Sequence, residues 1–129
     1  ASGPSSALHE GSDRRHQALS MTVVTFSSEG SRLVGFEVKG HSGYAEEGED
    51  IVCAAITSAV RVVECTVNDV LGLEAPVKVR EKDAYLSLKL PGGVGQTNES
   101  TCQALLTGLM VYLVQLAEEY PQHISVMEV

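Results

Sequence analysis

A histidine and a cysteine in the stretch Gly40–Ser58 have the residue types and spacing for nucleophilic catalysis. His41 stands next to Gly40, and Cys53 follows twelve positions later. A cysteine attacks a carbonyl carbon as its thiolate, and a histidine can accept the thiol proton and later donate it to the leaving amine. The chain between the two residues is long enough to fold back on itself. The pair could therefore break an amide bond through an acyl-enzyme intermediate.

The position of the cysteine in its predicted helix would activate it. Asp50 is a favoured N-cap residue, so Cys53 would lie in the first helical turn. Unpaired backbone N–H groups and the helix dipole stabilise an anion there and lower the pKa of a thiol. The N–H groups of Cys53 and Ala54 could hold the oxyanion of the reaction. We assign Asp50 to capping the helix rather than to orienting His41, and its carboxylate opposes the activation, as does that of Glu49.

The remaining pattern predicts two β-hairpins, two long helices and a last strand. The strands are rich in β-branched residues or alternate apolar with polar residues. They are predicted at Met21–Ser28, Leu33–Gly40, Pro76–Glu81, Ala84–Leu90 and His123–Val129. The order is ββαββα followed by a C-terminal strand. It predicts a single domain of the α+β class, with both helices packed on one sheet.

Both helices are predicted from apolar residues at three- and four-residue steps. The first, Ile51–Leu73, carries a stripe of valines that includes Val70, and Gly72 is suited to stop it. Valine has a low helix propensity, so burial must stabilise this helix. The second begins with Ser100–Gln103, which has capping-box spacing, and ends at Glu118–Pro121.

Length and charge exclude several classes of protein. Residues 1–20 lack apolar periodicity and stop just before Met21. We interpret them as a disordered leader or an expression remnant and residues 21–129 as one domain. The net charge of −8 argues against direct binding to nucleic acid. The longest uncharged run, Cys102–Ala117, is shorter than the roughly 20 residues that span a bilayer, so we expect no membrane segment.

The three cysteines do not form a metal or disulfide pattern. Their number is odd, and no CxxC pair occurs, which predicts reduced thiols in the cytoplasm. Zinc-finger spacing is absent, so we expect no metal and no cofactor. Cys65 is predicted to pack inside the first helix, whereas Cys102, near the start of the second, is the second candidate nucleophile. His123 is assigned a surface or strand-edge role.

The motif GHxGYAExGxDIVCAAxT, which covers residues 40–57, resembles the signature of the Prp family of ribosomal-processing cysteine proteases. The resemblance implies that His41 and Cys53 form the catalytic pair. It also implies removal of a short N-terminal extension from large-subunit ribosomal protein twenty-seven, a homodimer, and a loop that becomes ordered when substrate binds. Ser42 and Thr57 depart from the family pattern without removing a reacting group. Thr57 could assist near the thiol or bond back to a helix carbonyl.

The loop between the histidine and the cysteine is acidic. The residues that we assign to substrate contact are Gly43, Tyr44, Glu46, Glu47, Gly48 and Glu49. Their carboxylates suit the basic body of a ribosomal protein, although a solvated loop without that role has the same composition. Two other functions fit the residues. One is a non-catalytic ribosome-associated module that binds a peptide while Cys53 is buried, and the other is a redox-sensing thiol protein.

Overall fold

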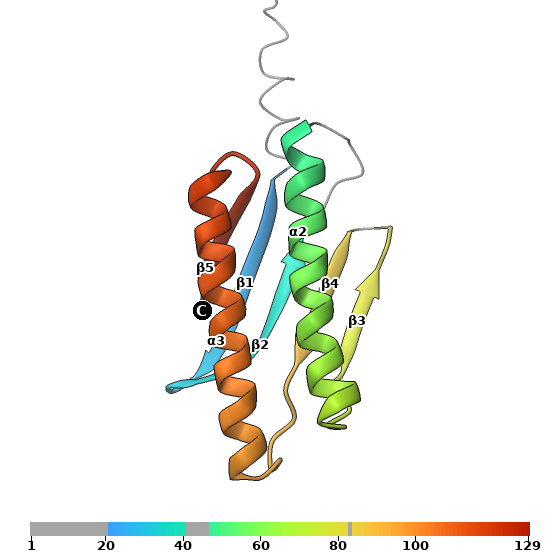
Figure 1. Cartoon of the computed structure of the whole chain (residues 1–129), viewed down its shortest axis with the longest axis vertical. Coiled ribbons are helices and arrows are strands. Elements are labelled where there is room, and N and C mark those ends of the chain that lie inside the picture. Colours follow the sequence, from blue (N-terminus) through green and yellow to red (C-terminus); the bar gives the residue numbers. More distant parts are fainter. Residues whose placement is uncertain (1–20, 41–46, 83) are drawn as a thin grey trace, which may run out of the picture.

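The computed structural model describes residues 21–40, 47–82 and 84–129, with the backbone alone described for 47–50. In these residues five strands form one sheet, and two long helices cover one of its faces (Figure 1). The elements in chain order are β1 (Thr22–Glu29), β2 (Arg32–Lys39), α2 (Glu47–Glu64), the π-helical segment η2 (Cys65–Val70), β3 (Val77–Arg80), β4 (Tyr85–Lys89), α3 (Gln96–Glu119) and β5 (Ile124–Glu128). The predicted α+β class and element order are confirmed. The predicted leader, residues 1–20, lies outside the described residues.

The strand order in the sheet is β3-β4-β2-β1-β5. Neighbouring strands run antiparallel except β1 and β5, which run parallel with Thr22 opposite Ile124. A register shift between Ser27 and Ser28 of β1 leaves Val34 as the extra residue of a β-bulge in β2. Both predicted hairpins, β1–β2 and β3–β4, are present. Strand β2 therefore lies at the centre of the sheet, with strands on both sides.

The core lies between the sheet and the two helices. The rings of Phe26 and Phe36, on the neighbouring strands β1 and β2, stand 5.9 Å apart from centroid to centroid. The helices cover these rings with their apolar stripes. The buried helix residues are Val52, Ile56, Val60, Val63 and Val67 from α2 and η2, and Cys102, Leu106, Leu109, Leu113 and Leu116 from α3. Burying one large apolar side chain contributes about 1.5–3 kcal/mol, so this layer holds both helices on the sheet.

The first helix changes its geometry before it ends. In the π-helical segment η2 the N–H of Leu71 donates to the carbonyl of Thr66, five residues earlier, at 2.9 Å. The wider turn departs from the 3.6-residue period of an α-helix. Val70, predicted to continue the apolar stripe, is consequently 75% exposed. Gly72 follows with a φ of 68° and ends the segment, as predicted.

The second helix begins earlier than predicted. It starts at Gln96, so the capping box predicted at Ser100–Gln103 is wrong. Gln103 contacts β2 instead. Its side-chain amide accepts a hydrogen bond from the N–H of Leu33 and donates one to the carbonyl of Leu33, both at 2.8 Å. These two bonds attach α3 to the central strand and explain why a local capping signal did not set the start of the helix.

Both helices are long and apolar enough to cross a membrane by length and composition alone, over Ile51–Val70 and Gln96–Glu119. A core helix of a globular domain meets the same two conditions. Here each helix buries an apolar stripe against the sheet. That packing favours the expectation of no membrane segment, which stays a prediction.

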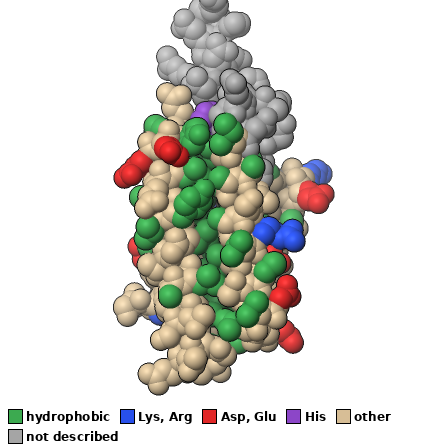
Figure 2. Space-filling view, viewed as in Figure 1, with side chains coloured by type: hydrophobic (Ala, Val, Ile, Leu, Met, Phe, Trp, Pro, Cys, Tyr) green, Lys and Arg blue, Asp and Glu red, His purple; other side chains and the backbone are tan. Residues whose placement is uncertain are grey.

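The outer face of the helix layer also carries apolar side chains. Figure 2 shows them along and between the two helices. The large exposed residues of the helices include Ile51, Val62, Val70 and Tyr112, which are 41–75% exposed, whereas the exposed Val111 and Val114 of α3 lie toward β5. Exposed apolar side chains that gather on one face are typical of a protein that contacts another molecule.

Gly35→Ala should destabilise the fold. Gly35 lies in β2 beside the bulge, and an added Cβ would collide with the backbone carbonyl oxygen of Leu88 in β4. Relieving this clash requires the two strands to separate locally, so we expect the free energy of unfolding to fall by about 1–3 kcal/mol. The matched control is Gly108→Ala on the exposed side of α3, where no atom lies within 4 Å of the added Cβ. That change should stabilise the protein by about 0.5–1 kcal/mol. Urea unfolding of both variants measures the two effects, and a shift of the same sign in both contradicts the explanation.

Candidate active site

Cys53 lies where α2 passes from the core to the surface. Its neighbour Val52 is fully buried and Ile56 is 2% exposed, whereas Ala54 and Thr57 are exposed. The cysteine itself is half-buried. A thiol at such a boundary is held by packing on one side and can be reached from the other. Reactive cysteines are found in partly exposed positions of this kind, and the role of Cys53 as the nucleophile stays a prediction.

The helix that carries Cys53 begins at Glu47, three residues before Asp50. The predicted N-cap role of Asp50 is therefore wrong, because this residue lies inside the helix. Cys53 is consequently in the second turn and not in the first. Glu47, Gly48 and Glu49, predicted to belong to the loop, form the first turn together with Asp50. The positive end of the helix dipole favours acidic residues in a first turn, which explains the earlier start.

This start changes which backbone groups can bind an anion. Within the helix, the N–H groups without an intrahelical acceptor belong to residues 47–49. Those of Cys53 and Ala54 fall within the regular hydrogen-bond pattern of the helix. The prediction that these two groups hold the oxyanion is therefore wrong. The dipole effect also falls off beyond the first turn, so activation of the thiol must depend mainly on a partner side chain.

Gly40 turns the chain out of the sheet immediately before His41. Its φ is 79°, and an added Cβ would lie 2.6 Å from the backbone carbonyl oxygen of Met21. Only glycine tolerates both conditions. The turn lies at the same end of the molecule as the start of α2 (Figure 1). The predicted site residues His41, Gly43, Tyr44 and Glu46 lie outside the described residues. Contact between His41 and Cys53 therefore stays a prediction.

The other two cysteines differ from their predicted roles. Cys102 is 1% exposed, and burial, followed by the negative charge of Glu99, raises the pKa of its thiol. A raised pKa favours the neutral thiol, which is a weak nucleophile, so the prediction of a second candidate nucleophile is wrong. Cys65, predicted to pack inside the helix, is exposed. It is the first residue of η2, where the helical period changes.

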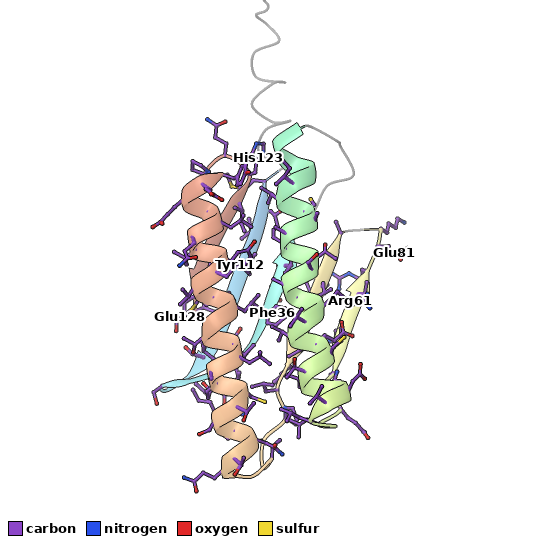
Figure 3. The ribbon with its side chains drawn as sticks, viewed as in Figure 1. Phe36, Arg61, Glu81, Tyr112, His123 and Glu128 are labelled. Carbon is purple, nitrogen blue, oxygen red and sulfur yellow. The ribbon has the colours of Figure 1, made fainter. Side chains whose placement is uncertain are left out.

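His123 is the only histidine in the part of the chain that the structure describes. It directly precedes the edge strand β5, and Figure 3 places it at the end of the molecule where α2 begins. Its carbonyl accepts a hydrogen bond from the N–H of Thr22, and its N–H donates to the carbonyl of Tyr120, both at 2.9 Å. This position agrees with the strand-edge role predicted for it. It also makes His123 a suitable control residue for His41.

A small apolar hollow opens one helical turn after Cys53, between α2 and the strands β2 and β4. Its volume is about 40 Å³. The residues that line it are Val38, Ile56, Thr57, Val60, Arg61 and Leu86. The sequence motif singled out Thr57. The hollow also needs Val38 of β2 and Leu86 of β4, and no local sequence pattern connects these strands with α2. A hollow of this kind beside a nucleophile can receive the tip of an apolar side chain.

The described residues do not include a group of three or more His, Cys, Asp or Glu side chains that could hold a metal ion. His41 and Glu46 lie outside the described residues, and only the backbone is described for Glu47, Glu49 and Asp50. The expectation that the site uses neither a metal nor a cofactor stays a prediction.

Known proteins resemble this chain in sequence or in fold. The ribosomal processing cysteine protease Prp of Bacillus subtilis (strain 168) is 28% identical over 94 residues, which make up 73% of this chain and 84% of that protein. An essential ribosomal processing protease Prp from S. aureus, solved in complex with a substrate peptide, has a TM-score of 0.73 at 18% identity and covers 84% of this chain and 100% of its own. A protein from Streptococcus mutans has a TM-score of 0.76 at 24% identity, covering 85% and 95% of the two chains.

The sequence model of one protein family extends over almost all of the described structure. The model described as cysteine protease Prp matches residues 21–125, from the start of β1 into β5. The match includes both His41 and Cys53. Together with the curated relative, it shows that the chain belongs to the Prp family of ribosomal-processing cysteine proteases.

Proposed function

We propose that this chain is an endopeptidase that removes a short N-terminal extension from large-subunit ribosomal protein twenty-seven in the cytoplasm. The observation that carries the proposal is the half-buried thiol of Cys53 in a chain that matches the Prp family model. The S. aureus relative was solved with a substrate peptide, which supports a peptide substrate here. The net charge of −8 suits a basic protein as that substrate.

In the proposed mechanism His41 acts first as a base and then as an acid. It accepts the thiol proton, and the Cys53 thiolate attacks the carbonyl carbon of the scissile bond. The imidazolium donates the proton to the leaving amine, and a thioester to Cys53 remains. His41 then takes a proton from a water molecule that attacks the thioester carbonyl carbon. It returns this proton to the sulfur as the C–S bond breaks, so the acid product leaves and the thiol is regenerated. The oxyanion donors must lie outside the regular hydrogen-bond pattern of α2, because the N–H of Cys53 is already paired within it.

The hollow next to Thr57 supports recognition of an apolar side chain near the scissile bond. Val38 and Leu86 form part of its wall, and Arg61 borders it. Figure 3 shows Arg61 on the flank of α2 that faces the β3–β4 hairpin. A substrate strand along this flank would pass Cys53 and place one side chain in the hollow. We propose that the acidic residues at the start of α2 attract the basic remainder of the substrate.

The exposed apolar face of the helix layer supports the proposed homodimer. Ile51 and Val62 of α2 and Tyr112 of α3 are 52%, 62% and 41% exposed. Pairing this face with that of a second copy would remove these side chains from water, which is favourable by about 25 cal/mol for each Å² of apolar surface.

A non-catalytic peptide-binding module is the second candidate function. The helix start at Glu47 favours it, because the backbone N–H groups at Cys53 are paired and stabilise a thiolate less than a first-turn position would. In that case the same acidic segment would bind a basic peptide without cleaving it.

Cleavage should depend on Cys53 and His41. A fluorogenic peptide that spans the junction between the extension and the mature ribosomal protein reports the reaction, and mass spectrometry locates the cut. We expect Cys53→Ala and His41→Ala each to lower kcat/KM at least about 1,000-fold, since each removes a reacting group. The matched controls are Cys65→Ala and His123→Gln, which change the same residue types elsewhere and should stay within about twofold.

The same assay distinguishes the two candidate functions. If the controls lose cleavage as well as the site variants, the loss would be due to impaired folding and not to a missing reacting group. Thermal unfolding of all four variants shows whether each is folded. If the unmodified protein binds the peptide under reducing conditions without cutting it, the peptide-binding module is the correct function.

The three thiols should react with iodoacetamide at different rates. Cys53 should be alkylated fastest and stay reactive to lower pH, because the proposed histidine partner favours its thiolate. Cys65, which is exposed, is the internal reference, and Cys102 should resist until the protein unfolds, because burial raises the pKa of its thiol. Peptide mass spectrometry gives each rate between about pH 5 and 9. His41→Ala should slow only Cys53, and equal rates at Cys53 and Cys65 in the unmodified protein contradict an activated thiol.

Filling the hollow should weaken substrate binding more than catalysis. Thr57→Leu adds apolar volume at its wall, and we expect KM to rise about fivefold, which corresponds to about 1 kcal/mol, with kcat changed less than twofold. Ser58→Leu is the control, because Ser58 is exposed on the same helix and does not line the hollow. Steady-state kinetics on the fluorogenic peptide separates the two constants. An equal rise in KM for both variants means that the hollow is not a side-chain site.

A further inference from the structure

The two edges of the sheet differ in how well they are protected against pairing with another strand. Strand β3 is four residues long, follows Pro76 and carries Lys78 and Arg80, all features that discourage strand addition. Strand β5 contains neither proline nor lysine. Met127 within it and Val129 just after it are 47% and 69% exposed. Of the two edges, β5 is the one suited to accept a strand.

The hydrogen bonds to β1 show which backbone groups of β5 face the open edge. The carbonyl of His123 accepts from the N–H of Thr22 at 2.9 Å, and the N–H of Val129 donates to the carbonyl of Phe26 at 2.8 Å. Successive residues of a strand direct their backbone groups to opposite sides. The backbone groups of the alternate residues, Val126 among them, therefore point away from β1. This edge can pair with an added strand without losing any bond to β1.

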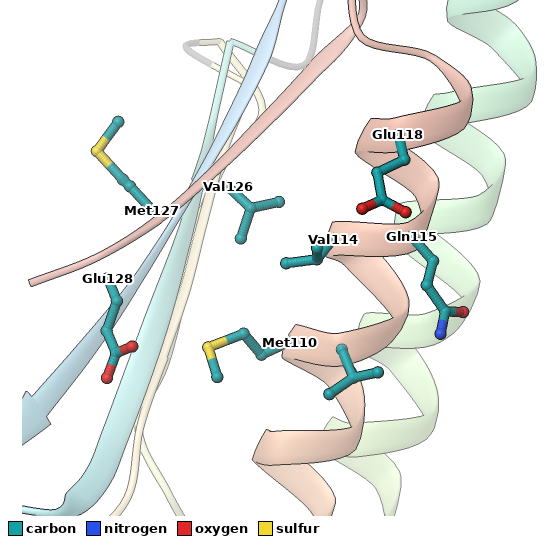
Figure 4. A pocket seen from close by; sticks show the side chains of 8 residues that line it. Met110, Val114, Gln115, Glu118, Val126, Met127 and Glu128 are labelled. Atoms are coloured by element: carbon teal, nitrogen blue, oxygen red, sulfur yellow. The ribbon is translucent and has the colours of Figure 1, made fainter.

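An apolar groove runs beside this edge, between β5 and α3, with a volume of about 550 Å³. Figure 4 shows Val126 of β5 facing Val114 and Met110 of α3 across it. Two carboxylates, Glu118 of α3 and Glu128 of β5, also line the groove. A strand added to β5 would direct every second side chain into this groove, where flexible methionine can adapt to its shape.

The charged side chains that α3 and β5 carry are all carboxylates. The chain contains no Lys or Arg after Lys89, whereas Glu99, Glu118, Glu119 and Glu128 follow it. Figure 2 shows carboxylates over the C-terminal end of α3. An acidic flank repels phosphate groups and would also repel the same flank of a second copy. It attracts a basic segment.

We propose that the β5 edge and its groove dock an extended, basic segment of a partner protein by strand addition. The segment pairs its backbone with the open edge, places apolar side chains against Met110, Val114 and Val126, and reaches Glu118 and Glu128 with Lys or Arg on the same face. The groove lies between α3 and β5, and Figure 1 shows β5 on the side of α3 that is away from α2. It is therefore separate from Cys53, and the docking goes beyond the proposed cleavage.

The test uses the full chain and a fluorescein-labelled probe peptide, Lys-Thr-Val-Thr-Val-Thr-Lys. This probe carries valines flanked by lysines on one face of a strand. Fluorescence anisotropy measures its Kd. A peptide with Glu in place of both Lys, and a version N-methylated at alternate residues to block strand pairing, should each bind at least about tenfold more weakly, equivalent to 1.4 kcal/mol. Cys53→Ala should bind the probe like the unmodified protein, so this result is independent of whether the chain is a protease.

Two variants test the edge and the carboxylates separately. Val126→Pro removes a backbone N–H that faces the open edge of β5. Val79→Pro is the matched control on β3. The carbonyl of Pro76 accepts a hydrogen bond from the N–H of Lys89 in β4, so the backbone groups of the alternate residues, Val79 among them, face away from β4. We expect Val126→Pro to abolish binding and Val79→Pro to leave it within twofold. Glu118→Gln combined with Glu128→Gln, which does not alter the backbone, should raise Kd about five- to tenfold at low salt.

Three outcomes overturn the proposal. The first is equal binding of the probe and its N-methylated version, which excludes strand pairing. The second is equal binding of the Lys and Glu peptides, which excludes the charge preference. The third combines two results: the probe does not bind, and analytical ultracentrifugation shows a dimer of the unmodified protein that Val126→Pro converts to monomers. That combination would identify the edge as a contact between two copies of the chain. If Val126→Pro does not fold, the double Gln variant and the N-methylated peptide decide the question.

Discussion

The packing of the α2 stripe against the central strand β2 is the constraint on which the site depends. Val52, Ile56 and Val60 are at most 3% exposed, and they fix the rotation of the helix about its axis. Cys53 follows Val52 directly, so this rotation sets the thiol at the boundary between core and surface. The same packing aligns the start of α2 with the end of β2, where the positive φ of Gly40 turns the chain out of the sheet just before His41. A substitution that rotates the helix would move the thiol without altering any residue of the motif.

The elements that the sequence predicted correctly are those whose signal repeats along the chain. Alternation in the strands and three- and four-residue spacing in the helices are each supported by several residues. The predicted starts of both helices were wrong because one capping residue contributes only about 1 kcal/mol to the stability of a helix. At α3 this signal competes with the Gln103 bonds to Leu33 and with the ion pair between Arg32 and Glu99. The parallel pairing of β5 with β1 joins the two ends of the domain, and no local pattern encodes such a contact.

Part of the candidate site was also predictable. The motif singled out Cys53 and Thr57, and both occupy one short stretch of α2 next to the apolar hollow. The walls of that hollow depend on which strands lie beneath the helix, so they could not be read from the motif. The helix start matters more for the chemistry. With the backbone N–H groups at Cys53 already paired, a histidine partner would carry most of the thiol activation, and the chemistry of the site would rest on the short segment that joins β2 to α2.

The two edge strands of the sheet carry charges of opposite sign, Lys78 and Arg80 on β3 and Glu128 on β5, and this separation contributes an electric dipole moment. All the Lys and Arg side chains of the described residues lie at or before Lys89, and the charged side chains of α3 and β5 are carboxylates. A molecule with this asymmetry turns in the field of a positively charged partner before the two surfaces touch. Such pre-orientation raises the association rate constant and makes it fall steeply as ionic strength rises. The acidic α3–β5 flank would therefore turn toward a basic protein or particle before contact.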